Sequence, residues 1–244
     1  MTSTLRPSRA RWPATILVGL ALIAVAGWWV INTPLFAMRT LVVSGNRHVP
    51  DAEVARLAGL SRTTNVMWLK ADTVANRIER DPWVLRAQVS RTLPGTVSIS
   101  IKERSPVAIV EAGKALLLVS GDGVIVGEAR LKARLPVIAL AGVRVSMGGR
   151  VSGSPALLAV ARSLPVGVRS KVARITQAGP GALTLVLRNG AHVLFGDASE
   201  AEAKGQALSS LLSWTSQRRI RADYIDVRAP AAPALLPVGA VTSG

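Results

Sequence analysis

The chain has 244 residues and a formal net charge of +16, with 49% hydrophobic but only 4% aromatic residues. This length is enough for one or two domains with hydrophobic cores. The absence of cysteine excludes a disulfide framework, thiolate catalysis and cysteine-containing metal sites. The excess of arginine is compatible with a genomic coding bias or with an anionic neighbour such as lipid head groups or wall polymers. No arginine cluster alternates with stacking aromatic residues, so nucleic-acid binding is not predicted.

The N-terminal region has the pattern of a membrane anchor. Residues 1–12 hold three arginines, and the next charged residue is Arg39. An apolar stretch of about 20 residues matches the hydrocarbon core of a bilayer, and Trp28 and Trp29 at its far end suit the membrane interface. We therefore predict a cytoplasmic tail at residues 1–12 and a transmembrane helix at residues 13–35. A cleaved secretory signal is the alternative, but the apolar run continues past the small residues that signal peptidase would accept.

A strand and two helices are predicted next. Residues 36–45 have the pattern of a strand. A helix with Pro50 in its first turn follows and ends at Gly59, a residue that readily adopts the left-handed conformation. A second helix begins near Asp72 and ends at Asp81, because the residue before a proline is displaced from the helical region.

Residues 81–108 then form a predicted β-hairpin. Residues 84–90 and 96–102 alternate between apolar and polar side chains. Between them, Leu93-Pro94-Gly95 supplies a turn, in which proline fixes φ and glycine accepts a positive φ. Two alternating runs around one turn indicate a hairpin with one buried face.

Several residues of this hairpin match a family signature. They are Pro82-Trp83-Val84, Ala87-x-Val89-x-Arg91, Pro94 and Glu103-Arg104-x-Pro106-Val107-Ala108. This pattern resembles the central signature of the FtsQ/DivIB family of bacterial cell-division proteins. The resemblance implies a POTRA domain at residues 36–103, with the order β-α-α-β-β, and a second, β-rich domain at residues 104–228.

The remainder of the chain has mostly strand patterns. Helices are predicted near residues 155–164 and 199–218, and Asn189-Gly190 between two apolar runs indicates a hairpin. A last strand is predicted at residues 222–228. The segment 229–244 is rich in Ala, Pro and Gly without periodicity and is predicted to be disordered. The predicted fold class is α+β: one N-terminal transmembrane helix, a POTRA domain, and a mainly antiparallel β domain with two helices.

The family resemblance also implies partners and a docking region. The partners would be the extracytoplasmic parts of FtsB and FtsL, which would dock at the last strand region by adding a strand to an open sheet edge. Transferred to this sequence, the candidate contact residues are Tyr224, Ile225, Asp226, Val227 and Arg228. The alternative for Ile225 and Val227 is a role in the core, and Tyr224 could pack at a domain edge.

Two further surfaces are candidates. Arg218, Arg219 and Arg221 form the densest basic run outside the predicted membrane segment. They are either a solvated face or a contact for an acidic partner segment or wall polymer. The edge of the POTRA sheet next to residues 41–44 is a second candidate for strand addition.

Catalytic and cofactor-binding motifs are absent from the sequence. The two histidines, His48 and His192, fall in different predicted domains, and the 14 acidic residues are scattered. G-x-S-x-G, the phosphate loop with G-K-[ST] and the penicillin-binding set S-x-x-K, S-D-N and K-T-G do not occur. We therefore predict no enzymatic activity, no catalytic residue, no metal and no cofactor.

Together these features predict a non-catalytic scaffold of the bacterial division machinery. It would lie in the plasma (inner) membrane with its N-terminus in the cytoplasm, gather FtsB and FtsL at the septum, and link them to septal peptidoglycan synthesis. One alternative is a POTRA component of outer-membrane assembly or secretion, although that class requires a downstream transmembrane barrel. Another is a membrane-anchored cell-wall enzyme with an unfamiliar site.

Overall fold

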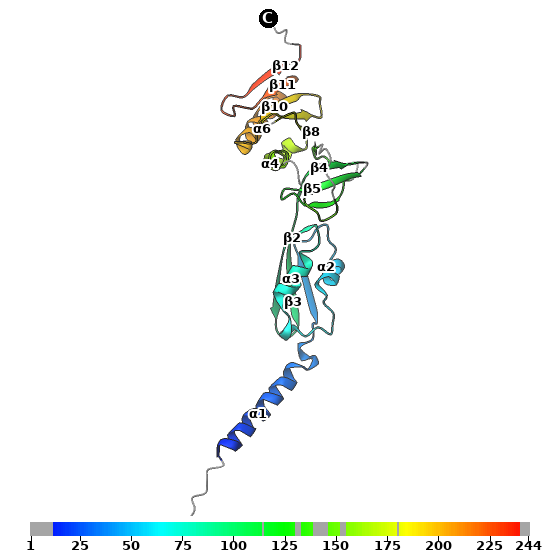
Figure 1. Cartoon of the computed structure of the whole chain (residues 1–244), viewed down its shortest axis with the longest axis vertical. Helices are drawn as coiled ribbons and strands as arrows, with labels where there is room; N and C mark the ends of the chain where they lie inside the picture. Colours follow the sequence, from blue (N-terminus) through cyan, green and yellow to red (C-terminus); the bar gives the residue numbers. More distant parts are fainter. Residues whose placement is uncertain are drawn as a thin grey trace, which may run out of the picture. The chain divides into compact units, whose positions relative to one another are not determined.

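A computed structural model of the chain describes residues 12–113, 115–129, 133–138, 146–151, 155–179 and 181–239 (Figure 1). Its internal contacts divide it into two compact units. The first unit comprises residues 1–79 and 86–102, and the second comprises residues 80–85 and 103–244. Except for Trp12, the predicted cytoplasmic tail at residues 1–12 lies outside the described residues.

Helix α1 (Trp12–Ile31) contains no charged residue. Its side chains are described from Ile16 onward, and nearly all of them are exposed. The side chain of Asn32 donates a hydrogen bond to the carbonyl of Trp28 near its C-terminal end, at 2.8 Å. Within the described residues, no helix reaches the length and hydropathy required of a membrane span. The transmembrane helix predicted at residues 13–35 is not confirmed and stays a prediction.

The rest of the first unit is a small α+β domain. Its elements are η1 (Pro34–Phe36), β1 (Thr40–Ser44), α2 (Asp51–Ala58), η2 (Val66–Trp68), α3 (Ala71–Ile78), β2 (Val84–Thr92) and β3 (Thr96–Glu103). The strands form one sheet in the order β1-β3-β2, and β1 runs parallel to β3. This order, β-α-α-β-β with two short 3-10 turns, is the POTRA arrangement predicted from the sequence.

Periodicity in the sequence explains the core of this domain. Val54 and Ala58 are four residues apart on α2, and Val74 and Ile78 are four apart on α3, so each pair lies on one helix face. Alternate residues of β3, namely Val97, Ile99 and Ile101, are almost completely buried. Each large apolar side chain buried in this way contributes about 1.5–3 kcal/mol.

The second unit is built on one long sheet. Its strands are β4 (Pro106–Ala112), β5 (Ala115–Ser120), β6 (Ile125–Glu128), β7 (Val137–Ile138), β8 (Val172–Gln177), β9 (Leu183–Leu187), β10 (His192–Gly196), β11 (Ala222–Asp226) and β12 (Ala234–Pro237). They are arranged in the order β12-β11-β10-β9-β8-β7-β4-β5-β6. Five neighbouring pairs are antiparallel and three are parallel, so the sheet is mainly antiparallel, as predicted.

Three helices pack against this sheet. They are α4 (Pro155–Ser163), α5 (Val166–Arg169) and α6 (Ala201–Arg218). Their buried side chains join those of the strands in one hydrophobic core, whose largest fully buried side chain is Phe195. The sequence predicted only two helices in this domain. Helix α5 was missed because it is a single turn after Pro165, too short for a periodic signal.

The predicted disorder of residues 229–244 is wrong for the segment 234–237. This segment forms β12, which pairs antiparallel with β11 and places Leu235 opposite Ile225. Its composition lacks strand periodicity, but the second edge of β11 offers unpaired backbone groups that an adjacent extended segment satisfies. Pro237 is tolerated because it stands at the end of the strand.

Candidate protein-binding surface

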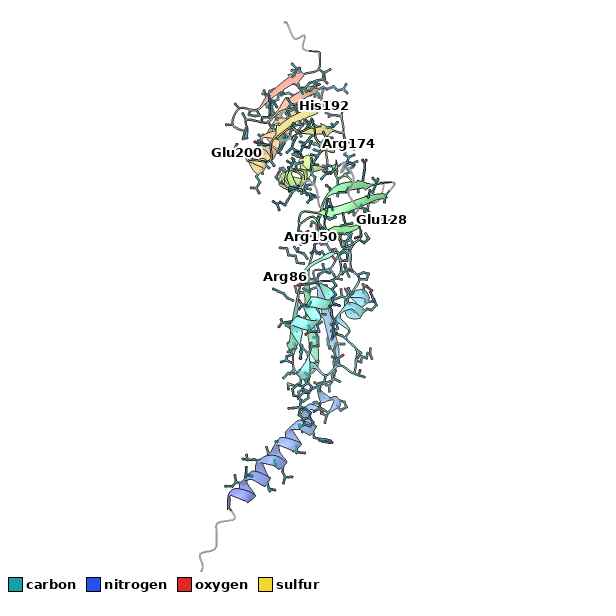
Figure 2. All side chains as sticks on the ribbon, viewed as in Figure 1. Arg86, Glu128, Arg150, Arg174, His192 and Glu200 are labelled. Carbon is teal, nitrogen blue, oxygen red and sulfur yellow. The ribbon has the colours of Figure 1, made fainter. Side chains whose placement is uncertain are left out.

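The strand predicted to contact partners, β11 with the two residues after it, alternates between buried and exposed side chains. Ile225 is 1% exposed and Val227 is fully buried, so both belong to the core. Tyr224 is 47% exposed. Its ring stacks on His192 of β10 with 5.6 Å between the ring centroids, and Figure 2 labels this histidine. Only the exposed members of the predicted set are therefore free to touch another molecule.

Asp226 and Arg228 are paired with each other. Nη2 of Arg228 lies 2.6 Å from Oδ2 of Asp226, and this hydrogen bond lowers the pKa of the Asp226 carboxyl. The aliphatic part of Arg228 covers Gly196 so closely that a Cβ added there would lie 3.1 Å from Cγ of Arg228. Gly196 also has a φ of +76°, which favours glycine. The pair thus caps the end of the β10–β11 ladder.

Strand β11 is not an open edge of the sheet. On one side His192, Val193 and Leu194 of β10 pair in parallel with its last three residues. On the other side β12 pairs with it from Ala222 to Asp226. Because both backbone edges of β11 are occupied in this structure, the expectation that β11 is itself the open edge is wrong. Contact of a partner with its exposed side chains stays a prediction.

The open edge next to the predicted site belongs to β12. In the described part of the chain, β12 has β11 as its one neighbour and ends the sheet. The backbone of Val238, just after the strand, donates to the carbonyl of Arg221 at 2.8 Å, which extends the attachment to β11. A firmly attached terminal strand with a free edge is the geometry that strand addition requires.

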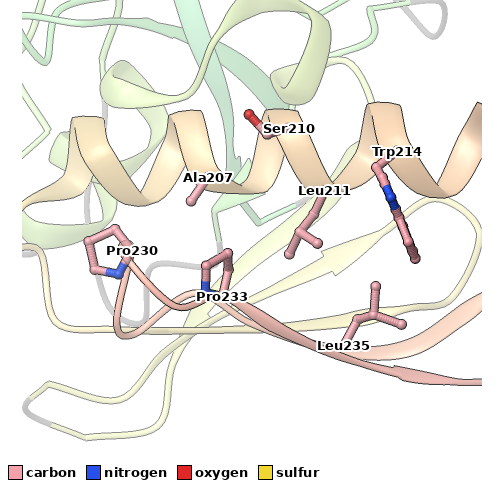
Figure 3. A pocket seen from close by; sticks show the side chains of 7 residues that line it. All are labelled: Ala207, Ser210, Leu211, Trp214, Pro230, Pro233 and Leu235. Atoms are coloured by element: carbon pink, nitrogen blue, oxygen red, sulfur yellow. The ribbon is translucent and has the colours of Figure 1, made fainter.

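An apolar groove of about 450 Å³ lies between α6 and the segment that carries β12 (Figure 3). Its lining residues are Ala207, Ser210, Leu211, Trp214, Pro230, Pro233 and Leu235. Trp214 is 40% exposed, which is unusual for a side chain of this size in a folded domain. The groove could accept apolar side chains of a segment that pairs with β12.

The three arginines of the second candidate set lie at the end of α6 and in the connection to β11. Arg218 places its guanidinium 4.5 Å from the ring centroid of Trp214, which links this set to the groove. Arg219 has a φ of +54° and closes the helix. Among the described residues, none of Arg218, Arg219 and Arg221 forms an ion pair with an acid. They therefore present positive charge beside the groove.

Arg104, at the end of the hairpin signature, is joined to Pro82-Trp83-Val84 at its start. Its guanidinium donates to the carbonyls of Pro82, at 3.0 Å, and Val84, at 2.6 Å, and forms an ion pair with Asp122. Its backbone N–H donates to the carbonyl of Trp83 at 2.7 Å. The side chain is only 14% exposed. The sequence pattern marked these residues as characteristic, but only the structure shows that they form one hydrogen-bonded cluster.

Lys204 is a buried cation that the sequence did not mark as a site. It is 3% exposed, and its Nζ donates to Oδ1 of Asp197 at 2.8 Å and to the Asp197 carbonyl at 3.1 Å. Its ammonium also lies 5.6 Å from the ring centroid of Phe195. The hydrogen bond from Lys204, with further ones from Ser199, lowers the pKa of Asp197 to about 2. This arrangement joins the start of α6 to the end of β10.

No metal-binding cluster of three or more His, Asp or Glu side chains occurs in the described residues. The two histidines are separated as predicted, one following β1 and the other on β10. The prediction that the protein is not an enzyme stays a prediction, because this arrangement alone does not test activity.

The two units define a protein with a POTRA-type domain and a second domain whose sheet, within the described residues, has β12 as an edge strand. A family model described as "POTRA domain, FtsQ-type" matches residues 36–104, and one described as "Cell division protein FtsQ/DivIB, C-terminal" matches residues 108–228. The chain therefore belongs to the FtsQ/DivIB family of cell-division proteins, as the signature in the sequence predicted.

Curated relatives agree with this assignment. Cell division protein FtsQ of Mycolicibacterium smegmatis is 30% identical over 203 residues, which cover 83% of this chain and 59% of that protein. Cell division protein FtsQ of Mycobacterium leprae is 31% identical, and the alignment covers 74% of this chain and 52% of that protein. Cell division protein FtsQ of Streptomyces collinus is 25% identical, and the alignment covers 93% of this chain and 92% of that protein. The chain thus spans somewhat more than half the length of the two mycobacterial relatives.

Proposed function

We propose that this protein is a non-catalytic scaffold of the bacterial division machinery. Helix α1 anchors it in the plasma (inner) membrane with the N-terminus in the cytoplasm, and both folded units lie outside. It is enriched at the septum, where it gathers FtsB- and FtsL-type proteins and, through them, the enzymes of septal peptidoglycan synthesis. Membership of the FtsQ/DivIB family is the observation that carries this proposal.

The proposal keeps the domain boundaries that were predicted from the sequence. Residues 13–35 are the anchor, 36–103 the POTRA domain and 104–228 the β domain, and the chain continues into β12. The apolar character of α1 supports the anchor, since its 20 residues carry no charge.

The partner segment docks by strand addition to β12 rather than to β11. The free edge of β12 supports this choice, and the adjacent groove supplies a place for apolar side chains of the added strand. The positive charge of Arg218, Arg219 and Arg221, which form no ion pair within the described residues, favours a partner segment with acidic residues. Exposed Tyr224 and Arg228 stay candidate contacts.

Depletion of the protein in its own organism tests the cellular role. Long cells without septa are expected, and a fluorescent fusion should lie at midcell before depletion. Normal division with loss of outer-membrane or secreted proteins would instead support a POTRA protein of a transport system. Turnover of wall precursors by the purified full chain would support the enzymatic alternative.

Truncation after Arg228 tests the docking edge. It removes β12 and uncovers β11, whereas truncation after Gly239 removes only the last five residues and serves as the control. Partner affinity is measured by titration in detergent and compared with that of the full chain. It should be at least about tenfold weaker, or about 1.4 kcal/mol, in the variant truncated after Arg228, and unchanged in the variant truncated after Gly239. Retained or stronger binding after Arg228 truncation would assign the docking edge to β11.

A further inference from the structure

Three loops of the first unit meet at the end of the domain where α1 joins it (Figure 1). We call residues 33–40, 60–70 and 91–96 the interface loops. The N–H of Met38 donates to the carbonyl of Thr64 at 2.9 Å, and that of Arg39 donates to the carbonyl of Gly95 at 2.8 Å. The three loops therefore form one continuous surface next to α1.

Large apolar side chains are exposed on this surface. Leu35, Trp68 and Leu93 are 48%, 51% and 50% exposed, and each comes from a different loop. The ring of Trp68 also contacts that of Trp28 near the end of α1, with centroids 5.6 Å apart. Side chains of this size are normally exposed singly on soluble proteins, whereas here three are exposed on joined loops, one of which contacts α1.

Every charged residue of the interface loops is positive. The four are Arg39, Arg62, Lys70 and Arg91, and the loops contain no aspartate or glutamate. A surface that combines tryptophan and leucine with basic residues alone is complementary to the head-group region of a bilayer with anionic lipids. A protein partner would more often meet a mixture of both signs of charge.

The turn that carries Trp68 is held in a fixed position. The guanidinium of Arg91 donates to three carbonyls of this segment, those of Val66, Met67 and Leu69. The side chain of Asn65 accepts from the N–H of Met67 and donates to the carbonyl of Ile31 at 2.8 Å. Trp68 is thus presented rigidly, at the level of the last turn of α1.

We propose that the interface loops are a lipid-binding surface that rests on the membrane. Trp68, Leu35 and Leu93 enter the head-group region, the basic side chains attract anionic lipids, and the POTRA domain is held against the bilayer instead of swinging on a free linker. The inference rests on the proposed membrane anchor, because α1 supplies the adjoining part of the membrane-bound surface.

The absence of cysteine allows a direct test with single spin labels on the full chain. The variants Trp68→Cys and Leu93→Cys place a nitroxide on the interface loops. Leu85→Cys is the matched control, since Leu85 is 41% exposed near the first residue of β2, whereas Leu93 follows the last residue of that strand. Leu20→Cys, within α1, reports on the anchor itself.

The labelled proteins are reconstituted into vesicles of phosphatidylcholine with phosphatidylglycerol, and collision with oxygen is compared with collision with a water-soluble nickel complex. The ratio of oxygen to nickel collisions should be several-fold higher at positions 68 and 93 than at position 85. It should fall at positions 68 and 93 when phosphatidylglycerol is omitted, because the basic residues lose their attraction.

The possible outcomes separate the two proposals. A membrane-like ratio at position 20 with water-like ratios at positions 68 and 93 would overturn the lipid-binding surface and leave the anchor standing. A water-like ratio at position 20 would overturn the anchor, and with it the lipid-binding surface. Because no partner is present in the vesicles, a membrane-like ratio at position 68 cannot come from a partner protein.

Discussion

Lys204 shows at the scale of single residues how a buried charge is accommodated. Its ammonium is almost fully removed from water, a cost that an unpaired cation could not recover. Two hydrogen bonds to Asp197 and the face of Phe195 offset that cost. The same contacts keep the Asp197 carboxyl ionised, since they favour its charged form.

This coupling predicts acid sensitivity. The pKa of Asp197 is lowered to about 2 in the folded protein from its ordinary value of 3.8, which applies to the unfolded chain. The contribution of this carboxylate to stability is therefore complete above the pKa of the unfolded chain and is lost as the pH falls through the pKa of the folded protein. The free energy of unfolding should therefore fall between about pH 4 and pH 2 by more in the wild type than in Asp197→Asn. Denaturant titration at several pH values measures it, and equal losses in both proteins would contradict the assignment.

Arg104 predicts a large effect of a single truncation. Arg104→Ala removes an ion pair with Asp122 and leaves the carbonyls of Pro82 and Val84 without their donor. Because hydrogen bonds to charged groups contribute about 1.5–3 kcal/mol each when partly buried, a loss of about 3 kcal/mol is expected. Chemical denaturation measures it. Arg86→Ala, on an exposed residue of β2 labelled in Figure 2, is the control and should change stability by less than about 0.5 kcal/mol.

At the scale of elements, β12 changes the interpretation of β11. The sequence identifies β11 by its apolar alternation and its resemblance to the family, and this suggested a contact strand. Pairing with β12 converts β11 into an internal strand whose core residues are Ile225 and Val227. The proposed docking edge therefore lies one strand further out, on β12, next to a groove that the strand pattern alone does not reveal.

The groove predicts a role for Trp214 in partner binding. Trp214→Ala removes its exposed ring and the cation–π contact with Arg218, but no core residue. Partner affinity should fall by about 1–2 kcal/mol, as expected for an aromatic anchor, with little change in unfolding free energy. Val166→Ala, at a 77% exposed position on α5, is the control for a surface truncation. Unchanged affinity in Trp214→Ala would exclude the groove from the interface.

At the scale of the whole molecule, the two folded units and α1 have separable roles in the proposal. The first unit carries the loops proposed to contact lipid, and the second carries the edge strand proposed to bind partners. In this proposal, neither lipid contact nor partner binding requires a particular sequence within α1, except in its last turn, where Trp28 contacts Trp68 and the carbonyl of Ile31 accepts from Asn65.

This separation predicts that the anchor can be exchanged. Replacing residues 1–27 by an unrelated single-span helix should preserve midcell localisation and division in a depletion strain, because the partner-binding edge is untouched. Replacing the same residues by a cleaved secretory signal should abolish both, since the released protein is no longer concentrated at the membrane. Full complementation by the released form would contradict the need for an anchor.

The sequence by itself determined the elements whose signals are local. The turn at Leu93-Pro94-Gly95 and the alternation around it identified the hairpin, and the family signature within it identified the FtsQ/DivIB family. Periodicity located α2, α3 and α6 to within a few residues. These features depend on residues close together in the chain, so short-range sterics and hydrophobic period suffice to predict them.

Only the tertiary structure decided which strand is the edge and which side chains meet. β12 has no strand pattern of its own and forms because β11 offers a backbone edge. Arg104 reaches carbonyls 20 and 22 residues earlier in the chain, and the interface loops come from three separate segments. Such contacts join residues that are distant in sequence, and their geometry depends on how the whole chain folds, which no local pattern encodes.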